Sequence, residues 1–161
     1  MFIRAAILAL ALAPQLVVAE LQTGLDAYER GDYAAAVREF RSLADEGDAE
    51  AQTRLGLCYA EGKGVPQDDT QAIHWFRKAA EQGYAKAQFH LGTMHFTGRG
   101  VPQSDTQTVH WYRKAAEQGH AQAQFHLGAH YGSGRGVPKD KTQAAHWTLE
   151  SADQGLSLIH I

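Results

Sequence analysis

Apolar residues in the segment 49–84 recur at intervals of three and four, which is the spacing of one face of an α-helix. The apolar positions are Ala51, Leu55, Cys58 and Tyr59 in the first half, and Ala72, Trp75, Phe76, Ala79 and Ala80 in the second. The pattern predicts two amphipathic helices, near 49–61 and 70–82.

Signals at the ends of these stretches support the two helices. The intervening GKGVP contains paired glycines that permit positive φ and a proline that bars helix. Asp68 is followed three residues later by Gln71, which is typical of a capping box, and Gly83 suits the end of a helix. The segment is therefore expected to fold as helix, loop and helix.

The same pattern returns every 36 residues. HWFRKAAEQG at 74–83 becomes HWYRKAAEQG at 110–119 and HWTLESADQG at 146–155. Further helices are expected near 85–97, 106–118, 121–133 and 142–153. A fixed period of this length indicates a repeat array, in which stacked units bury one continuous core. The predicted fold is an all-α solenoid of stacked helix–loop–helix repeats.

The predicted organisation has three full repeats and a divergent first copy. The repeats span 49–84, 85–120 and 121–155, and residues 20–48 form a looser copy that lacks the GVP loop and caps the array. Each first helix contains a glycine, Gly56, Gly92 or Gly128, although glycine costs about 1 kcal/mol relative to alanine inside a helix. These glycines predict close contact with a neighbouring helix.

The two ends of the chain depart from the repeat. Residues 1–19 contain Arg4, an apolar run and small residues up to Ala19, which predicts a secretory signal cleaved after Ala19. The mature chain would then have no integral membrane span and would be periplasmic or secreted; an uncleaved anchor is the alternative. Residues 156–161 read LSLIHI and break the pattern, which suggests an anomalous tail or a truncation.

The motifs A-x-A-Q-x-x-L-G, G-x-G-V-P and W-[FY]-R-K-A-A-E-Q-G resemble those of the Sel1-like repeat family, which is related to tetratricopeptide repeats. The resemblance implies an α/α right-handed superhelix and a non-catalytic adaptor for other proteins, often in bacterial envelopes. Some secreted members are cysteine-rich and linked to penicillin binding. This chain has only Cys58, so that function is not carried over.

Net charge and cysteine content limit the classes of partner and ligand that the chain is expected to bind. The formal charge is −3, and removal of Arg4 leaves −4, so a nucleic-acid partner, which requires a basic surface, is not expected. No cofactor or obligate small molecule is implied. Cys58 cannot form an internal disulfide, and its place on the apolar face of a helix predicts a buried, inert thiol.

The nine histidines raise the alternative of an envelope enzyme or a transition-metal binder. His74, His110 and His146 share one outward-facing register, but stacked helices lie about 10 Å apart, too far for one metal ion. His126 and His130 lie one helical turn apart without the glutamate of a zinc protease. Packing and surface roles are therefore favoured for the histidines, and core positions for Trp75, Trp111 and Trp147.

The first helix of each repeat is expected to line a concave groove that binds a protein or peptide. Its outward positions hold Glu50, Arg54, Leu57 and Glu61, then Lys86, His90, Thr93 and Thr97, then Gln122, His126, Ala129 and Ser133. These positions differ between copies, whereas Arg77-Lys78 and Arg113-Lys114 on the second helices repeat. We expect Arg54, His90 and His126, none of them a core position, to align as a basic ladder for an acidic partner. Binding should strengthen as histidines with pKa near 6.5 gain protons.

Overall fold

The computed structural model describes residues 17–155; residues 1–16 and 156–161, which hold most of the predicted signal and the LSLIHI tail, lie outside the described residues. Residues 17–29 are helical, so the predicted cleavage site after Ala19 lies within a helix. The other helices are α2 (Tyr33–Asp45), α3 (Ala49–Glu61), α4 (Asp69–Glu81), α5 (Ala85–Thr97), α6 (Asp105–Glu117), α7 (Ala121–Ser133) and α8 (Lys141–Asp153). No strand occurs within residues 17–155, and none of the helices there is long and apolar enough for a membrane span.

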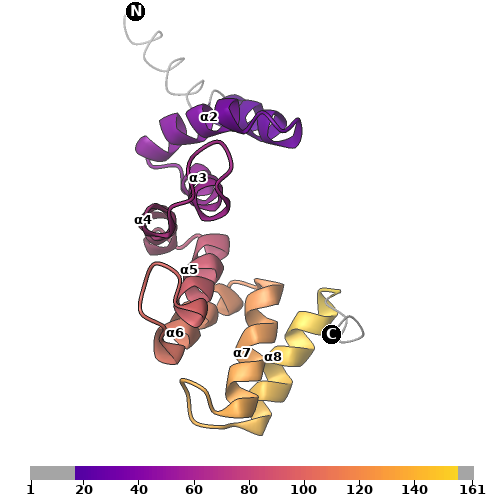
Figure 1. Ribbon diagram of the computed structural model, residues 1–161. Helices are drawn as coiled ribbons and strands as arrows, with labels where there is room; N and C mark the ends of the chain where they lie inside the picture. The colour runs from indigo at the N-terminus through magenta and orange to yellow at the C-terminus, as the bar shows by residue number, and fades with distance from the viewer. Residues whose placement is uncertain (1–16, 156–161) are drawn as a thin grey trace, which may run out of the picture.

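The all-α solenoid predicted from the sequence is confirmed, with every helix of the three repeats within one residue of its expected ends. We call α3, α5 and α7 the A helices and α4, α6 and α8 the B helices. Each A helix packs on its own B helix, and α4 and α6 pack in turn on the next A helix. The stack follows an arc in which α4 and α6 lie outside and α3 and α5 toward the inside (Figure 1).

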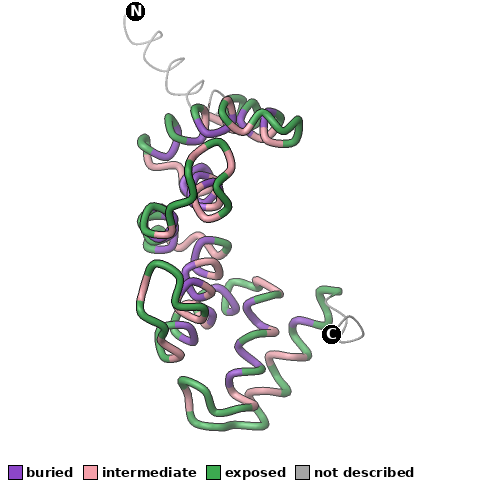
Figure 2. The backbone as a smooth tube through the Cα atoms, in the orientation of Figure 1, coloured by how far each residue is buried: buried purple, intermediate pink, exposed green. Residues whose placement is uncertain are grey.

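The core is shared between successive repeats. Buried residues follow the faces where helices meet, and the A-to-B loops are largely exposed (Figure 2). Val101 packs half-buried against the cluster that α4 and α5 form, and Val137 against that of α6 and α7. These two GVP valines are therefore plugs over inter-repeat cores, and the third, Val65, packs half-buried against the cluster that includes α2 and α3. Of the three tryptophans predicted in the core, Trp75 is buried, whereas Trp111 and Trp147 are half-buried.

In the described B helices, the side chain of the predicted capping residue accepts its hydrogen bond, whereas the return bond of the capping box does not form. The Asp68 carboxylate accepts the N–H of Gln71 at 3.0 Å, and the Ser104 hydroxyl accepts the N–H of Gln107 at 3.2 Å. The reciprocal half of the capping box is replaced, because the N–H of Asp68 donates to the carbonyl of Tyr59 at 3.0 Å. The cap residue thereby ties the start of helix B to the end of helix A.

The helical glycines lie against side chains of helix B, as predicted. A Cβ atom on Gly56 would lie 2.7 Å from the Phe76 ring, and one on Gly92 would lie 2.7 Å from the Tyr112 ring. Both distances are below any normal van der Waals contact. The ring of helix B therefore rests directly on the backbone of helix A.

A buried glutamine relay, which was not predicted from the sequence, joins three successive helices. The Gln52 side-chain amide donates to the carbonyl of Ala44 at 3.0 Å, and Gln82 donates to the Gln52 side-chain oxygen at 2.8 Å. The equivalent sets are Ala80, Gln88 and Gln118, then Ala116, Gln124 and Gln154. The glutamines of helix A are almost fully buried, so their hydrogen bonds to the preceding helix are shielded from water and stabilise the repeat register, whereas Gln82, Gln118 and Gln154 are exposed.

Replacing Gly92 by Ala should destabilise the fold by about 1–3 kcal/mol, because the new methyl group overlaps the Tyr112 ring and this overpacking exceeds the gain in helix propensity. Gly132→Ala in α7 is the matched control, since its Cβ would meet only the Ala144 Cβ at 3.7 Å, an ordinary contact. The control should be neutral or stabilising. Urea unfolding followed by circular dichroism measures both, and equal effects of the two substitutions would contradict the packing role of Gly92.

Candidate functional site

The predicted groove residues of the first full repeat are partly engaged with one another. The Arg54 guanidinium lies 3.2 Å from the Glu50 carboxylate within α3, and both side chains are about one-third exposed. Burial, followed by the nearby Glu50 carboxylate, raises the pKa of Tyr84, which begins the next repeat. Arg54 therefore does not present a free charge, because Glu50 offsets it.

Two other predicted groove residues contribute to packing. Leu57 is half-buried against the cluster of α4 and α5. The Thr93 hydroxyl lies 3.1 Å from the Tyr112 hydroxyl and donates to the Phe89 carbonyl at 3.1 Å. Leu57 is thereby tied to the next repeat and Thr93 to helix α6 of its own repeat, and only part of each side chain remains for a partner.

His90 and His126 stack on rings of the preceding repeat. The ring centroids of Phe76 and His90 are 5.1 Å apart with planes 19° apart, and those of Tyr112 and His126 are 5.4 Å apart at 24°. The Phe76 and Tyr112 rings also rest on glycines of their own A helices. Each ring is thus held between its own repeat and the next.

This stacking overturns the expected basic ladder. Burial, followed by the electrostatic effect of His120, lowers the pKa of His90 to about 4. Desolvation by the rings around it also lowers the pKa of His126, although that residue is exposed. Both imidazoles are neutral at pH 7, so a titration near 6.5 was the wrong expectation. His90 is also half-buried and stacks on Phe76, although it was predicted to lie outside the core.

The structure brings together a cluster of rings that was not predicted from the sequence. The ring of Phe89, on α5, lies close to four other rings. Its centroid is 4.8 Å from that of His120, 5.5 Å from that of Tyr112, 5.6 Å from that of His90 and 5.9 Å from that of His126. We call the line between α5 and α7, marked by Lys86, Phe89, Phe96, His120 and His126, the α5–α7 seam. The sequence did contain a sign of this cluster. The repeat position of Phe89 holds threonine in the first full copy and phenylalanine in the next two.

His120 is positioned by the start of α7. Its Nδ1 accepts the N–H of Ala123 at 3.3 Å, so the imidazole serves as the N-cap of the helix and stacks on Phe89. Burial and the charge of Lys86 lower the pKa of His120. The seam therefore has two imidazoles of lowered pKa, His120 and His126, beside one lysine.

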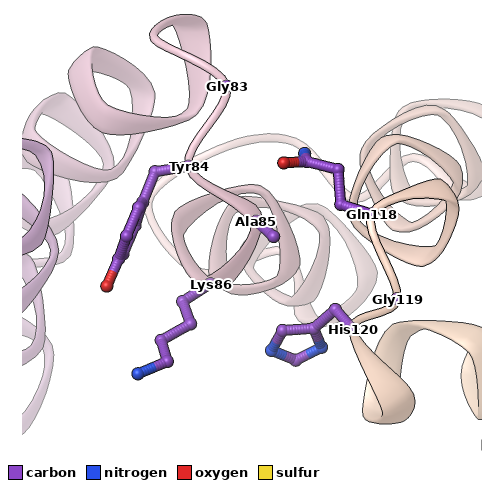
Figure 3. Close-up of a pocket in the computed structure, with 7 residues that line it drawn as sticks. All are labelled: Gly83, Tyr84, Ala85, Lys86, Gln118, Gly119 and His120. Atoms are coloured by element: carbon purple, nitrogen blue, oxygen red, sulfur yellow. The ribbon is translucent and has the colours of Figure 1, made fainter.

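Two hollows lie along the seam. The first, about 350 Å³, is lined by Gly83, Tyr84, Ala85, Lys86, Gln118, Gly119 and His120. The side chains of Tyr84, Lys86 and His120 extend to the same side of the α5 N-terminus (Figure 3). The second, about 120 Å³, is lined by Phe96, His126, Ala129, His130, Ser133 and Arg135. Since Phe89 contacts a ring of each hollow, the two hollows are linked along the seam.

The described residues do not converge on a catalytic or metal site. Between residues 17 and 155, no three His, Cys, Asp or Glu side chains gather closely enough to hold a metal ion. His130 is buried with Nδ1 2.9 Å from the Arg135 carbonyl. Cys58 is buried as predicted, and burial raises the pKa of its thiol to about 11, which disfavours a nucleophilic thiolate. His74, His110 and His146 are exposed, as predicted.

Three of the four basic residues that repeat on the B helices, Lys78, Arg113 and Lys114, contact aromatic side chains. The Lys78 ammonium lies 4.7 Å from the Trp75 ring centroid, and Lys114 lies 5.0 Å from that of Trp111. The Arg113 guanidinium donates to the Tyr131 hydroxyl of the next repeat at 2.9 Å. These contacts give the repeated B-helix cations a structural role.

All three repeats match a known protein family. The family model described as "Sel1 repeat" matches residues 49–84, 85–120 and 121–156. A crystal structure of a Sel1 repeat protein from Oxalobacter formigenes superposes with a TM-score of 0.81 at 36% identity, covering 84% of this chain and 54% of that one. The chain thus spans about half the length of that relative.

Two further proteins are similar to this chain in fold alone or over a short segment. Helicobacter pylori cysteine rich protein B superposes with a TM-score of 0.63 at 16% identity, covering 76% of this chain and 90% of that one, which shows a shared fold. DAP3-binding cell death enhancer 1 of Rattus norvegicus is 41% identical over 49 residues. That match covers 30% of this chain and 10% of the rat protein, so it concerns only a small part of the curated relative.

Acidification should unfold the protein partly through His90. A lowered pKa means that the unfolded chain binds the proton first, so stability is complete above pH 6.5 and falls as the pH approaches 4. The loss attributable to His90 is up to about 3 kcal/mol. His90→Phe keeps a ring on Phe76 but cannot titrate, and it should flatten the decline in urea-unfolding free energy between pH 6.5 and 4.

The matched control is His74→Phe, because His74 is exposed on a B helix. Its pH profile should follow that of the unsubstituted protein. A decline that His90→Phe leaves unchanged would show that the stack does not keep His90 neutral.

Proposed function

The chain belongs to the Sel1 repeat family, whose members generally act as protein-interaction scaffolds, and on this basis we propose that it binds a protein or peptide in the concave groove of its A helices. The scaffold is non-catalytic and serves the bacterial envelope or a secreted pathway. The observation that carries the groove assignment is the contrast between its two faces. B-helix cations repeat and pack on neighbouring rings, whereas A-helix groove residues differ from copy to copy.

The exposure of the outward A-helix positions indicates which of them are available to a partner. Of the outward A-helix positions in the second and third repeats, six are exposed. They are Lys86, Thr97, Gln122, His126, Ala129 and Ser133. In the first full repeat only Glu61 is exposed, and it lies 2.7 Å from Lys63. The free surface of the groove is therefore concentrated on α5 and α7.

Site-specific photo-crosslinking tests the groove directly. A benzoylphenylalanine at Gln122, exposed on α7, should give a protein adduct on irradiation in the native host, identified by mass spectrometry. The same residue at His110, exposed on B helix α6, is the control and should give none. Adducts at His110 without any at Gln122 would move the partner to the convex face.

We also propose that the chain is exported, with residues 1–19 as its signal. The support is the order of Arg4, an apolar run and small residues up to Ala19. Fractionation of the native host should recover the protein in the periplasm or medium, and N-terminal sequencing should begin at Glu20. A cytosolic product that begins at Met1 would reject export.

A further inference from the structure

The α5–α7 seam has a chemistry that the preceding seam between α3 and α5 lacks. Phe89 supplies its central ring, whereas the same register in α3 holds Thr53, which is buried and donates to the Ala49 carbonyl at 2.7 Å. Consequently the rings of His120, Tyr112 and His126 meet a phenyl ring only at the α5–α7 seam. This seam is the more distinctive part of the groove.

The rings form a surface suited to an aromatic side chain. His126 is exposed and His120 is half-buried, so both imidazoles have area available beside the half-buried Phe89. Aromatic rings prefer offset stacking or edge-to-face contact, and each such pair contributes about 0.5–1.5 kcal/mol beyond its buried area. Since burial keeps these imidazoles neutral, a ring can cover them without desolvating a charge.

A single cation marks one end of the seam. Lys86 is exposed in the first hollow, and it belongs to none of the salt bridges among residues 17–155. The lining of both hollows contains no aspartate or glutamate. The two groove carboxylates on α3 are already paired, Glu50 with Arg54 and Glu61 with Lys63. A carboxylate of a partner would therefore complement Lys86 without opposition from neighbouring acids.

The length of the seam fits an extended chain. His120 and Ser133 mark the two hollows at opposite ends of α7, and thirteen residues of helix correspond to about 20 Å. An extended peptide rises about 3.3 Å per residue, so about six residues cover this distance. Lys86 and Phe89 lie three residues apart on α5, so their Cβ atoms are about 5–6 Å apart, a distance within the roughly 7 Å that two residues of such a peptide span.

We propose that the α5–α7 seam binds an extended segment of the partner protein that carries an aromatic side chain with an aspartate or glutamate within two residues of it. The aromatic side chain packs on Phe89, His120 and His126, and the carboxylate pairs with Lys86. This assignment rests on the scaffold function proposed above and adds the chemical class of the bound segment.

A random heptapeptide library displayed on phage, selected on the immobilised full chain, tests this chemistry. The unsubstituted protein should enrich peptides with an aromatic residue and an acid within two positions. Lys86→Glu should retain the aromatic residue and replace the acid by lysine or arginine. A synthetic copy of an enriched peptide should bind Lys86→Glu about five- to tenfold more weakly in fluorescence anisotropy. Lys114→Glu, on the B helix α6, is the matched control and should select as the unsubstituted protein does.

Phe89→Thr tests the aromatic half, because threonine already occupies the same register at Thr53. It should lose the aromatic preference while circular dichroism shows unchanged helicity; if it fails to fold, the Lys86→Glu selection decides. Identical selections by Lys86→Glu and the unsubstituted protein, or no enrichment on the latter, would overturn the proposal. A partner crosslinked at Gln122 whose bound segment lacks the aromatic–acidic pair would overturn this chemistry but leave the scaffold function standing.

Discussion

The close contact between a ring of helix B and a glycine of helix A is the constraint on which the rest of the solenoid depends. Gly92 admits the Tyr112 ring to the backbone of α5, which sets the spacing within the repeat. The same ring also stacks with His126 of the next repeat. One aromatic residue thereby determines both how a repeat closes and where its successor begins, and the Gly56, Phe76 and His90 set repeats the arrangement.

The groove owes its chemistry to this packing. Because the histidines of the A helices complete ring stacks, they lose water and remain neutral, and the concave face is more aromatic than basic. The groove charge of the second and third repeats is then carried by Lys86, at the edge of the stack. His90 and His126 therefore belong both to the proposed groove and to the contacts that join the repeats.

The sequence predicted the helices closely because their ends depend on local signals. Asp68 and Gly83 act within one turn of the helix they begin or end, and both are read directly from the chain. The contact of Gly92 was also predictable, since a glycine that recurs inside a helix despite its low helix propensity indicates a close approach by a neighbouring helix. The lowered pKa of His90 was not predictable from the sequence. Its ring meets Phe76 of a different repeat, and the loss of water there follows from three-dimensional packing. Phe89 was missed for a similar reason: its four ring neighbours come from α5, α6 and α7 with its N-cap.

The glutamine relay has a consequence for how such a chain changes length. Each relay links a carbonyl near the end of one helix B to glutamines in the next A and B helices, as with Ala80, Gln88 and Gln118. Deleting or duplicating a whole block of 36 residues brings equivalent partners together again, whereas an insertion of another length within a helix would separate them. The groove can therefore grow or shrink only in fixed increments. Evolution by duplication of complete units is the route that these hydrogen bonds leave open.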